Sequence, residues 1–313
     1  MSMRTLGIDT SNYTTSAAVF DGSGGENVGR LLDVPAGALG LRQSEALFQH
    51  VKRLPGLLHQ LKERGLLRDI AAVAASTRPR AVEGSYMPCF LAGEGQGRAL
   101  ADALDVPFVP VSHQQGHLAA AAWSAGRMDL LDRPFLAWHL SGGTTELLLV
   151  SPEEGNLRAE KLGGTSDLSA GQLIDRTGQR LGLAFPSGKA LEALYPAEGA
   201  RAVFPVKLTD FTFSLSGMEN QVKGLLERGG TPAEAARFTL DTLIDIILRT
   251  TRAAKADHPG LPVLCSGGVA SNAQLREVLS RDCGALFAQP RYATDNAMGA
   301  AILAFRCGRG AAA

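Results

Sequence analysis

The chain has 313 residues, 45% of them hydrophobic and 20% charged, so it can bury large cores and is not a disordered protein; at about 150 residues per domain we expect two domains. Its 31 basic and 31 acidic side chains balance, which excludes a globally basic nucleic-acid binder, and its four cysteines form no C-x-x-C pair, which disfavours a disulfide scaffold, a zinc ribbon and an iron–sulfur site. No apolar run reaches the roughly 18 residues of a membrane span and the N-terminus does not resemble a signal peptide, so we expect a cytoplasmic protein that does not bind a membrane.

The first predicted elements recur 130 residues later in the chain. Residues 4–20 and 134–150 both consist of an apolar segment, a short polar turn and a second apolar segment, the pattern of two strands joined by a tight turn. When the segments are superposed, Thr14-Thr15 coincides with Thr144-Thr145. The similarity indicates a duplicated fold, and the alternative is two unrelated hairpins.

The polar turns of both segments are candidates for binding an anion such as a phosphate. Turn amides and hydroxyls can face an anion, and a glycine can take a positive φ and lets a ligand approach the backbone. The candidates are Asp9, Thr10 and Ser11 in the first segment and Ser141, Gly142, Gly143, Thr144 and Thr145 in the second.

A strand–helix–strand pattern follows the first hairpin. Residues 71–76 and 107–111 have the composition of buried strands, and residues 89–104 between them have that of a helix. This βαβ unit predicts a parallel sheet, so the two halves are expected to be α/β domains.

Two histidines follow the second of these strands. His113 and His117 are four residues apart, so on a helix they share one face and can chelate one metal ion. A third ligand is needed, and Asp295 is a candidate, although it could instead cap the helix expected over about 296–307. The alternative for the histidines is a solvated helix face. No glutamate stands next to the first histidine, which disfavours a metalloprotease.

The second half contains two carboxylates that could bind ribose hydroxyls. Asp167 and Asp175 are eight residues apart, near two turns of a predicted helix, so they would share one face. Asp167 could instead cap this helix, and simple solvation is the alternative for either carboxylate.

A strand, a glycine pair and a helix start follow near the C-terminus. Residues 231–256 form a long helix that begins with a capping box, and residues 263–265 form a strand. Gly267-Gly268 then turns the chain, and Asn272 or Ser271 can cap the next helix, whose N-terminus favours an anion. A plain turn is the alternative.

Taken in order, these segments resemble one family. It is the TsaD family, the threonylcarbamoyl transferases that make N6-threonylcarbamoyladenosine in tRNA, long labelled O-sialoglycoprotein endopeptidases. The matching segments span nearly the whole chain and are residues 7–11, 111–117, 140–147, 170–177, 181–188, 211–217, 267–272 and 294–297.

The resemblance implies a fold, a reaction and partners. The fold is the duplicated actin-like, sugar-kinase-like ATPase fold, with residues 1–130 as the first domain, 131–295 as the second, a cleft between them, and the helix over about 296–307 packing back on the first. The reaction transfers the threonylcarbamoyl group from threonylcarbamoyl-adenylate to N6 of adenosine 37 in tRNA, without a covalent protein nucleophile. Companion proteins such as TsaB and TsaE-like proteins, and a dimer, are implied as partners.

The resemblance also assigns the site residues. One divalent ion, iron or zinc, is bound by His113, His117 and Asp295. The positions implied for an adenine nucleotide or acyl-adenylate are Ser141, Gly142, Gly143, Thr144, Thr145, Asp175, Gly188, Asn272 and, four residues after Gly188, Glu192.

The sequence departs from the family pattern at several positions. Asn12, Tyr13 and Thr14 stand where the family has Cys-Asp-Glu, and Thr144 replaces a histidine. Gly164 and Leu168 replace acidic residues in the segment that precedes the predicted helix. Two alternatives to the transferase are a diverged paralogue, which hydrolyses a nucleotide or transfers another carbamoyl group, and a non-catalytic partner protein.

Overall fold

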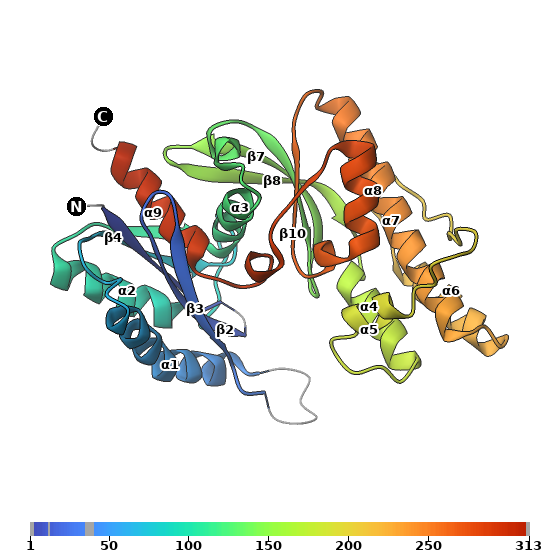
Figure 1. Cartoon of the computed structure of the whole chain (residues 1–313), viewed down its shortest axis with the longest axis horizontal. Coiled ribbons are helices and arrows are strands. Elements are labelled where there is room, and N and C mark those ends of the chain that lie inside the picture. Colours follow the sequence, from blue (N-terminus) through green and yellow to red (C-terminus); the bar gives the residue numbers. More distant parts are fainter. Residues whose placement is uncertain (1–2, 12, 35–40, 311–313) are drawn as a thin grey trace. The chain divides into compact units, whose positions relative to one another are not determined.

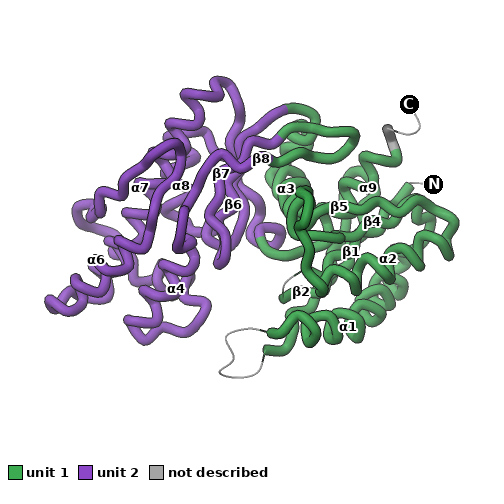
Figure 2. The backbone as a smooth tube through the Cα atoms, turned by 180° about the vertical axis from the view of Figure 1, so that it is seen from behind, with its two compact units in different colours: residues 1–133, 151–159, 294–313 green, residues 134–150, 160–293 purple. Residues whose placement is uncertain are grey.

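The computed structural model describes residues 3–11, 13–34 and 41–310. The chain forms two compact α/β units (Figure 2). Unit 1 comprises residues 1–133, 151–159 and 294–313, and unit 2 comprises residues 134–150 and 160–293.

Unit 1 is built around a five-stranded sheet with helices on both faces (Figure 1). The strand order is β3-β2-β1-β4-β5, with β2 antiparallel to its two neighbours and β1, β4 and β5 parallel. The elements are β1 (Arg4–Asp9), β2 (Thr14–Phe20), β3 (Gly25–Leu31), α1 (Gln43–Glu63), β4 (Ile70–Arg78), α2 (Phe90–Leu104), β5 (Phe108–Ser112), α3 (His113–Ser124), η1 (Met128–Asp132) and α9 (Met298–Gly310).

Two adjacent residues of β1 show how the helices cover this sheet. Ile8 lies in the core with α1 and α2, and a Cβ placed on Gly97 of α2 would contact the Ile8 side chain. Gly7 points to the opposite face, where a Cβ would lie 2.4 Å from backbone atoms of Ala297 and Ala301. Glycine at position 7 therefore allows α9 to pack directly on β1.

Unit 2 has a six-stranded sheet of order β11-β10-β6-β7-β8-β9. Leu136, Trp138 and Leu140 of β6 face a large apolar core that the helices of the unit cover. The elements are β6 (Phe135–Leu140), β7 (Thr145–Glu153), β8 (Asn156–Thr165), α4 (Ala170–Arg180), α5 (Gly188–Ala193), β9 (Thr212–Phe213), α6 (Ser216–Glu227), α7 (Pro232–Asp257), β10 (Val263–Ser266), η2 (Val269–Ser271), α8 (Ala273–Cys283), β11 (Leu286–Phe287) and η3 (Pro290–Tyr292).

The two sheets are repeats of one another. The order β3-β2-β1-β4-β5 in unit 1 recurs as β8-β7-β6-β10-β11 in unit 2. The hairpin register also recurs, because Phe135 pairs with Val150, and these positions lie 130 residues after the pair Thr5 and Phe20. The predicted duplicated α/β fold is therefore confirmed, down to the register of the hairpin strands.

The units differ in detail from the expected domains at 1–130 and 131–295. Residues 151–159, at the tip of the β7–β8 hairpin, group with unit 1, and so do residues 294 and 295. The last helix begins at Met298, two residues later than expected, because Asn296 precedes it as a turn.

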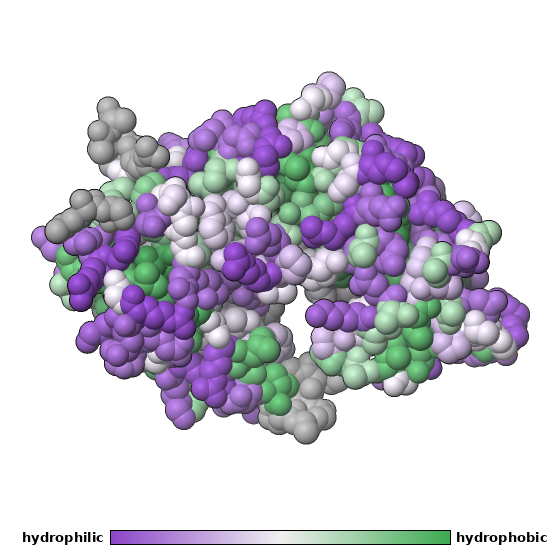
Figure 3. All heavy atoms as spheres, viewed as in Figure 1, coloured by the Kyte–Doolittle hydropathy of each residue, from purple (hydrophilic) through white to green (hydrophobic). Residues whose placement is uncertain are grey.

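The surface is mixed in character. On the face shown in Figure 3, hydrophilic side chains are interspersed with smaller hydrophobic areas. None of the helices formed by the described residues is long and apolar enough to cross a membrane.

Candidate functional site

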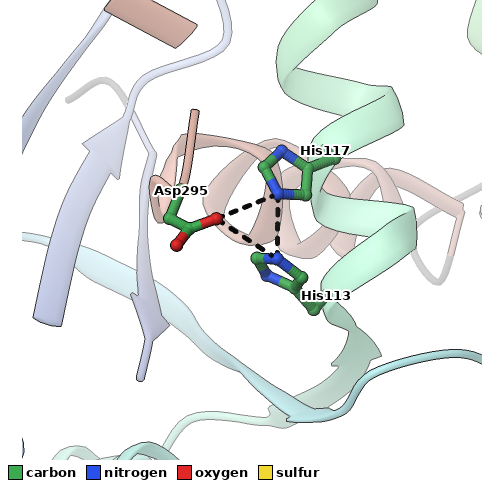
Figure 4. Close-up of side chains that lie close together, drawn as sticks. All are labelled: His113, His117 and Asp295. Atoms are coloured by element: carbon green, nitrogen blue, oxygen red, sulfur yellow. Dashed lines mark hydrogen bonds and ion pairs between the residues drawn. The ribbon is translucent and has the colours of Figure 1, made fainter. Parts of the chain in front are cut away.

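The two predicted metal-binding histidines lie in the first turns of α3. Ser112, the last residue of β5, caps this helix: its Oγ accepts from the Gln115 amide at 3.2 Å, and its own amide donates to Gln115 Oε1 at 2.8 Å. This capping box fixes where the helix begins, so His113 and His117 fall one turn apart on one face. Their Nε2 atoms are 2.9 Å apart (Figure 4).

Asp295 approaches the histidines from the segment before α9. Its Oδ1 lies 3.5 Å from Nε2 of His113 and 3.4 Å from Nε2 of His117 (Figure 4). The competing role as helix cap is taken by Asn296, whose Oδ1 accepts from the Met298 amide at 3.1 Å. The structure therefore brings the three predicted ligands together, from positions nearly 180 residues apart in sequence.

Two glycines allow α3 and α9 to approach closely enough for this. A Cβ placed on Gly299 would lie 1.8 Å from the carbonyl oxygen of Gly116, so the two backbones touch here. Gly116 lies between the two histidines, and Gly299 lies four residues after Asp295. The contact therefore sets the distance between the two segments that carry the three side chains.

The donor set fits one divalent ion. Two imidazole nitrogens and one carboxylate oxygen, all within 4.8 Å of one another, form the cluster of metal-binding type found among the described residues. Three such ligands suit zinc or iron and leave coordination positions open for water or substrate.

The charges in the cluster are strongly coupled. Burial by itself would lower the pKa of His113, but the carboxylates of Asp9 and Asp295 outweigh it and raise this pKa to about 10. Burial would raise the pKa of Asp295, but the two imidazoles hold it well below its usual range. Without a metal, a proton therefore occupies the cluster at neutral pH, and a bound ion would replace it.

The three residues predicted as a phosphate turn in unit 1 all contact protein groups. The Thr10 hydroxyl donates to the Cys89 carbonyl at 3.0 Å and accepts from the Gly93 amide at 3.0 Å. Ser11 Oγ donates to Asp9 Oδ2 at 2.9 Å, and the same Asp9 oxygen lies 3.1 Å from Nδ1 of His113. A role for them in phosphate binding stays a prediction. The sequence analysis did not connect Asp9 with the histidines, because only the fold brings positions 9 and 113 together.

In unit 2, the turn between β6 and β7 exposes its two glycines. The turn is closed by the Ser141 amide, which donates to the Thr144 carbonyl at 2.8 Å, and by the Thr144 amide, which donates to Ser141 Oγ at 3.1 Å. Neither Gly142 nor Gly143 has a positive φ, so that part of the expectation was wrong. A Cβ on either glycine would meet no atom within 4 Å, and the space beside this backbone is therefore open to a ligand.

The N-terminus of α4 is attached to this turn. The Ala170 amide donates to Thr145 Oγ1 at 2.8 Å, and Ser169 Oγ donates to the Gly142 carbonyl at 2.6 Å. Ser169 also caps α4 in a capping box with Gln172. The expectation that Asp167 caps this helix was therefore wrong.

Asp167 instead connects two other segments. Its carboxylate accepts from Ser216 Oγ at 2.7 Å and from the Leu215 amide at 2.9 Å, where α6 begins. These hydrogen bonds hold the pKa of Asp167 well below its usual range, although burial alone would raise it.

The remaining predicted ligand positions lie at turns and helix starts of unit 2. Asp175 Oδ1 accepts from the Ser187 amide at 2.8 Å, Asn272 Oδ1 caps α8 by accepting from the Leu275 amide at 2.9 Å, and Glu192 Oε1 accepts from the Ala273 amide at 2.7 Å. The negative charge expected at the start of α8 is thus supplied by the protein itself. Gly188 resembles Gly143 in having open space where a Cβ would stand.

Comparison with known proteins identifies the family. A family model described as TsaD, tRNA N6-adenosine threonylcarbamoyltransferase, matches residues 40–302. The chain belongs to the TsaD family. A relative in Granulibacter bethesdensis, named tRNA N6-adenosine threonylcarbamoyltransferase, is 36% identical over 94% of this chain and 85% of its own length.

Solved structures support the fold assigned to this TsaD family member. Full-length HypF, solved in a phosphate- and nucleotide-bound form, aligns with a TM-score of 0.64 at 12% identity, over 96% of this chain and 55% of HypF. An activator of 2-hydroxyisocaproyl-CoA dehydratase from Clostridium difficile, solved with ADPNP, aligns with a TM-score of 0.53 at 12% identity, over 99% of this chain and 97% of that chain. These likenesses confirm the actin-like, sugar-kinase-like fold.

The departures from the TsaD pattern have different structural contexts. Asn12 lies outside the described residues, Tyr13 is partly exposed, and Thr14 begins β2. Gly164, in place of an acidic residue, has a φ of +123°, and a Cβ there would lie 2.2 Å from the Thr145 carbonyl oxygen. The backbone at position 164 therefore requires glycine and cannot simply accept the acid.

Proposed function

We propose that this protein transfers the threonylcarbamoyl group from threonylcarbamoyl-adenylate to N6 of adenosine 37 in tRNA. The observation that supports this best is the convergence of His113, His117 and Asp295 in a chain of the TsaD family. The cofactor proposed is one divalent ion, iron or zinc, bound by these three side chains. Family membership further supports tRNA as substrate, and TsaB and TsaE-like companions and a dimer as partners.

The proposed reaction is an acyl transfer without a covalent enzyme intermediate. The N6 amine attacks the carbamoyl carbon, the bond from this carbon to the phosphate oxygen breaks, AMP leaves, and N6 loses a proton. A bound divalent ion would supply Lewis acidity toward the carbamoyl or phosphate oxygens. The protein then has to bind and orient the two reactants.

The residues of unit 2 are proposed to bind the adenylate. The open backbone at Gly142 and Gly143, with the hydroxyls of Ser141 and Thr144 beside it, suits a phosphate. Gly188 leaves space at the start of α5 for a flat group. Asp175, Glu192 and Asn272 each use one polar atom within the protein and have a second for the ligand, while Thr145 holds the turn in place.

A second candidate function is that of a diverged paralogue acting on another carbamoyl group or on a nucleotide. The observation that favours it is Gly164, because the backbone there has changed together with the lost acid. This candidate shares the metal cluster, so only the product distinguishes it from the first.

The experiment is complementation of a strain that lacks this protein and any second copy. We expect its tRNA to lose threonylcarbamoyladenosine, the wild-type chain to restore it, and His113→Ala/His117→Ala to fail. The control is His59→Ala/His258→Ala, in which the first side chain is 67% exposed and neither belongs to the cluster. Unchanged threonylcarbamoyladenosine in the strain without the protein would contradict the transferase and favour the paralogue.

A further inference from the structure

A buried carboxylate lies directly behind the metal cluster. Asp9 is the last residue of β1 and is 1% exposed. Its Oδ1 accepts from the Ser11 amide at 3.0 Å, and its Oδ2 accepts from Ser11 Oγ at 2.9 Å. The same Oδ2 lies 3.1 Å from Nδ1 of His113, on the side of the ring away from His117 and Asp295.

We infer that Asp9 is a positioning residue for the metal ligand His113. It accepts a hydrogen bond from Nδ1–H and so keeps Nε2 free of a proton and directed at the ion. The inference rests on the metal site in the proposed function, and it replaces phosphate binding as the role of Asp9.

The hairpin itself does not require an acid at this position. In the repeated hairpin of unit 2 the position equivalent to Asp9 is His139, which pairs with Glu146 as Asp9 pairs with Ser16. The two hairpins share one register with different residues here. The carboxylate is therefore better explained by His113 than by the fold.

The hydrogen-bond pattern requires a carboxylate rather than an amide. Asp9 receives three donors: the amide and the hydroxyl of Ser11, and Nδ1–H of His113. In Asp9→Asn one of the two atoms becomes an NH2 group. It cannot face the Ser11 amide, which only donates, so it takes the Oδ2 position and donates to Nδ1. His113 then carries its proton on Nε2, the atom that should bind the metal.

The experiment measures Zn²⁺ binding and the tautomer of the histidine, not activity. Zn²⁺ titrations by calorimetry compare the wild-type chain, Asp9→Asn and the matched control Asp21→Asn. Asp21 is a suitable control because it accepts from the Ser23 amide at 3.0 Å and from Ser23 Oγ at 2.9 Å, the same local pattern without a histidine. In parallel, ¹H–¹⁵N NMR of the Zn²⁺-loaded wild-type chain identifies the protonated nitrogen of His113.

We expect Asp9→Asn to weaken Zn²⁺ binding by about 10- to 100-fold, Asp21→Asn to leave it unchanged, and the loaded wild-type His113 to be protonated on Nδ1. Equal Zn²⁺ affinity in Asp9→Asn and wild type would overturn the inference while the metal site stands. If Asp9→Asn does not fold, the NMR measurement decides, and an Nε2–H on the loaded wild-type His113 would overturn it. A wild-type chain that does not bind Zn²⁺ would remove the proposed metal site itself.

Discussion

Replacing Gly299 by alanine should separate the metal ligands without touching them. The new Cβ would lie 1.8 Å from the Gly116 carbonyl oxygen, and real contacts of this kind are not shorter than 3.0 Å. The backbones of α3 and α9 must therefore move apart by at least about 1.2 Å at this point. Metal–ligand distances tolerate only about 0.2 Å, so the His113–His117 pair and Asp295 would no longer bind one ion together.

We expect Gly299→Ala to weaken Zn²⁺ binding at least tenfold and to lower the free energy of unfolding by about 1–3 kcal/mol, the usual cost of overpacking. The control is Gly116→Ala, on the other side of the same contact. Its Cβ would meet only the Ala300 amide nitrogen at 3.8 Å, an ordinary van der Waals distance. Because alanine favours the helix over glycine, Gly116→Ala should be as stable as wild type or up to about 1 kcal/mol more stable, with unchanged Zn²⁺ affinity.

Calorimetric titration with Zn²⁺ and thermal unfolding of both variants form the assay. The reasoning is refuted if Gly299→Ala binds Zn²⁺ as tightly as wild type, since the helix contact would then not set the ligand distances. It is also refuted if Gly116→Ala loses Zn²⁺ to the same extent, because the loss would then follow from any change of glycine in these helices.

Three further predictions concern the ligand turn, acid stability and the pH dependence of metal binding. Gly143→Val should weaken ADP binding at least tenfold with an unchanged melting temperature, whereas Gly267→Ala, at a φ of +96° and 2.2 Å from the Leu140 oxygen, should lower the melting temperature by several degrees; equal ADP affinity in Gly143→Val and wild type would contradict the first part. Asp167→Asn should cost about 1 kcal/mol at pH 7, since its largely exposed carboxylate has a lowered pKa and stabilises the fold above its ordinary value of 3.8; in denaturant titrations this difference should shrink as the pH falls below 3.8. Because protonated His113 stabilises the metal-free fold fully below its ordinary pKa of 6.5 and this stabilisation is lost as the pH rises through about 10, Zn²⁺ affinity should rise about tenfold per pH unit between these values, and a flat pH profile in calorimetry would count against the coupling.

The sequence predicted those features that depend on local pattern. Alternation of apolar residues around a polar turn located both hairpins, and superposing Thr14 on Thr144 gave the register that the sheets have. Helical spacing alone placed His113 and His117 on one face. Asp295 came from its place in the ordered series of family segments, because no local pattern connects it with residues nearly 180 positions earlier.

What the sequence did not predict depends on contacts between distant segments or on competition between neighbours. Asp9 could not be connected with His113, because only the packing of β1 beside α3 brings them together. For the cap of α4, both Asp167 and Ser169 were suitable residues. The signal that decides between them is Gln172, three residues after Ser169, which completes a capping box. Positive φ was expected at Gly142 and Gly143, but among these turns it occurs at Gly164 and Gly267, where a neighbouring strand leaves no space for a Cβ.

The division of the chain into units separates what the family pattern retains from what it has lost. All three metal ligands and their buried partner Asp9 lie in unit 1, whereas Thr144, Gly164 and Leu168 lie in unit 2 with the proposed adenylate turn. If the paralogue is correct, its difference from the transferase should therefore concern which adenylate or nucleotide binds, and Zn²⁺ affinity should be the same for either function. Measurements of metal binding cannot decide between the two functions, and ligand binding to unit 2 together with the tRNA product can.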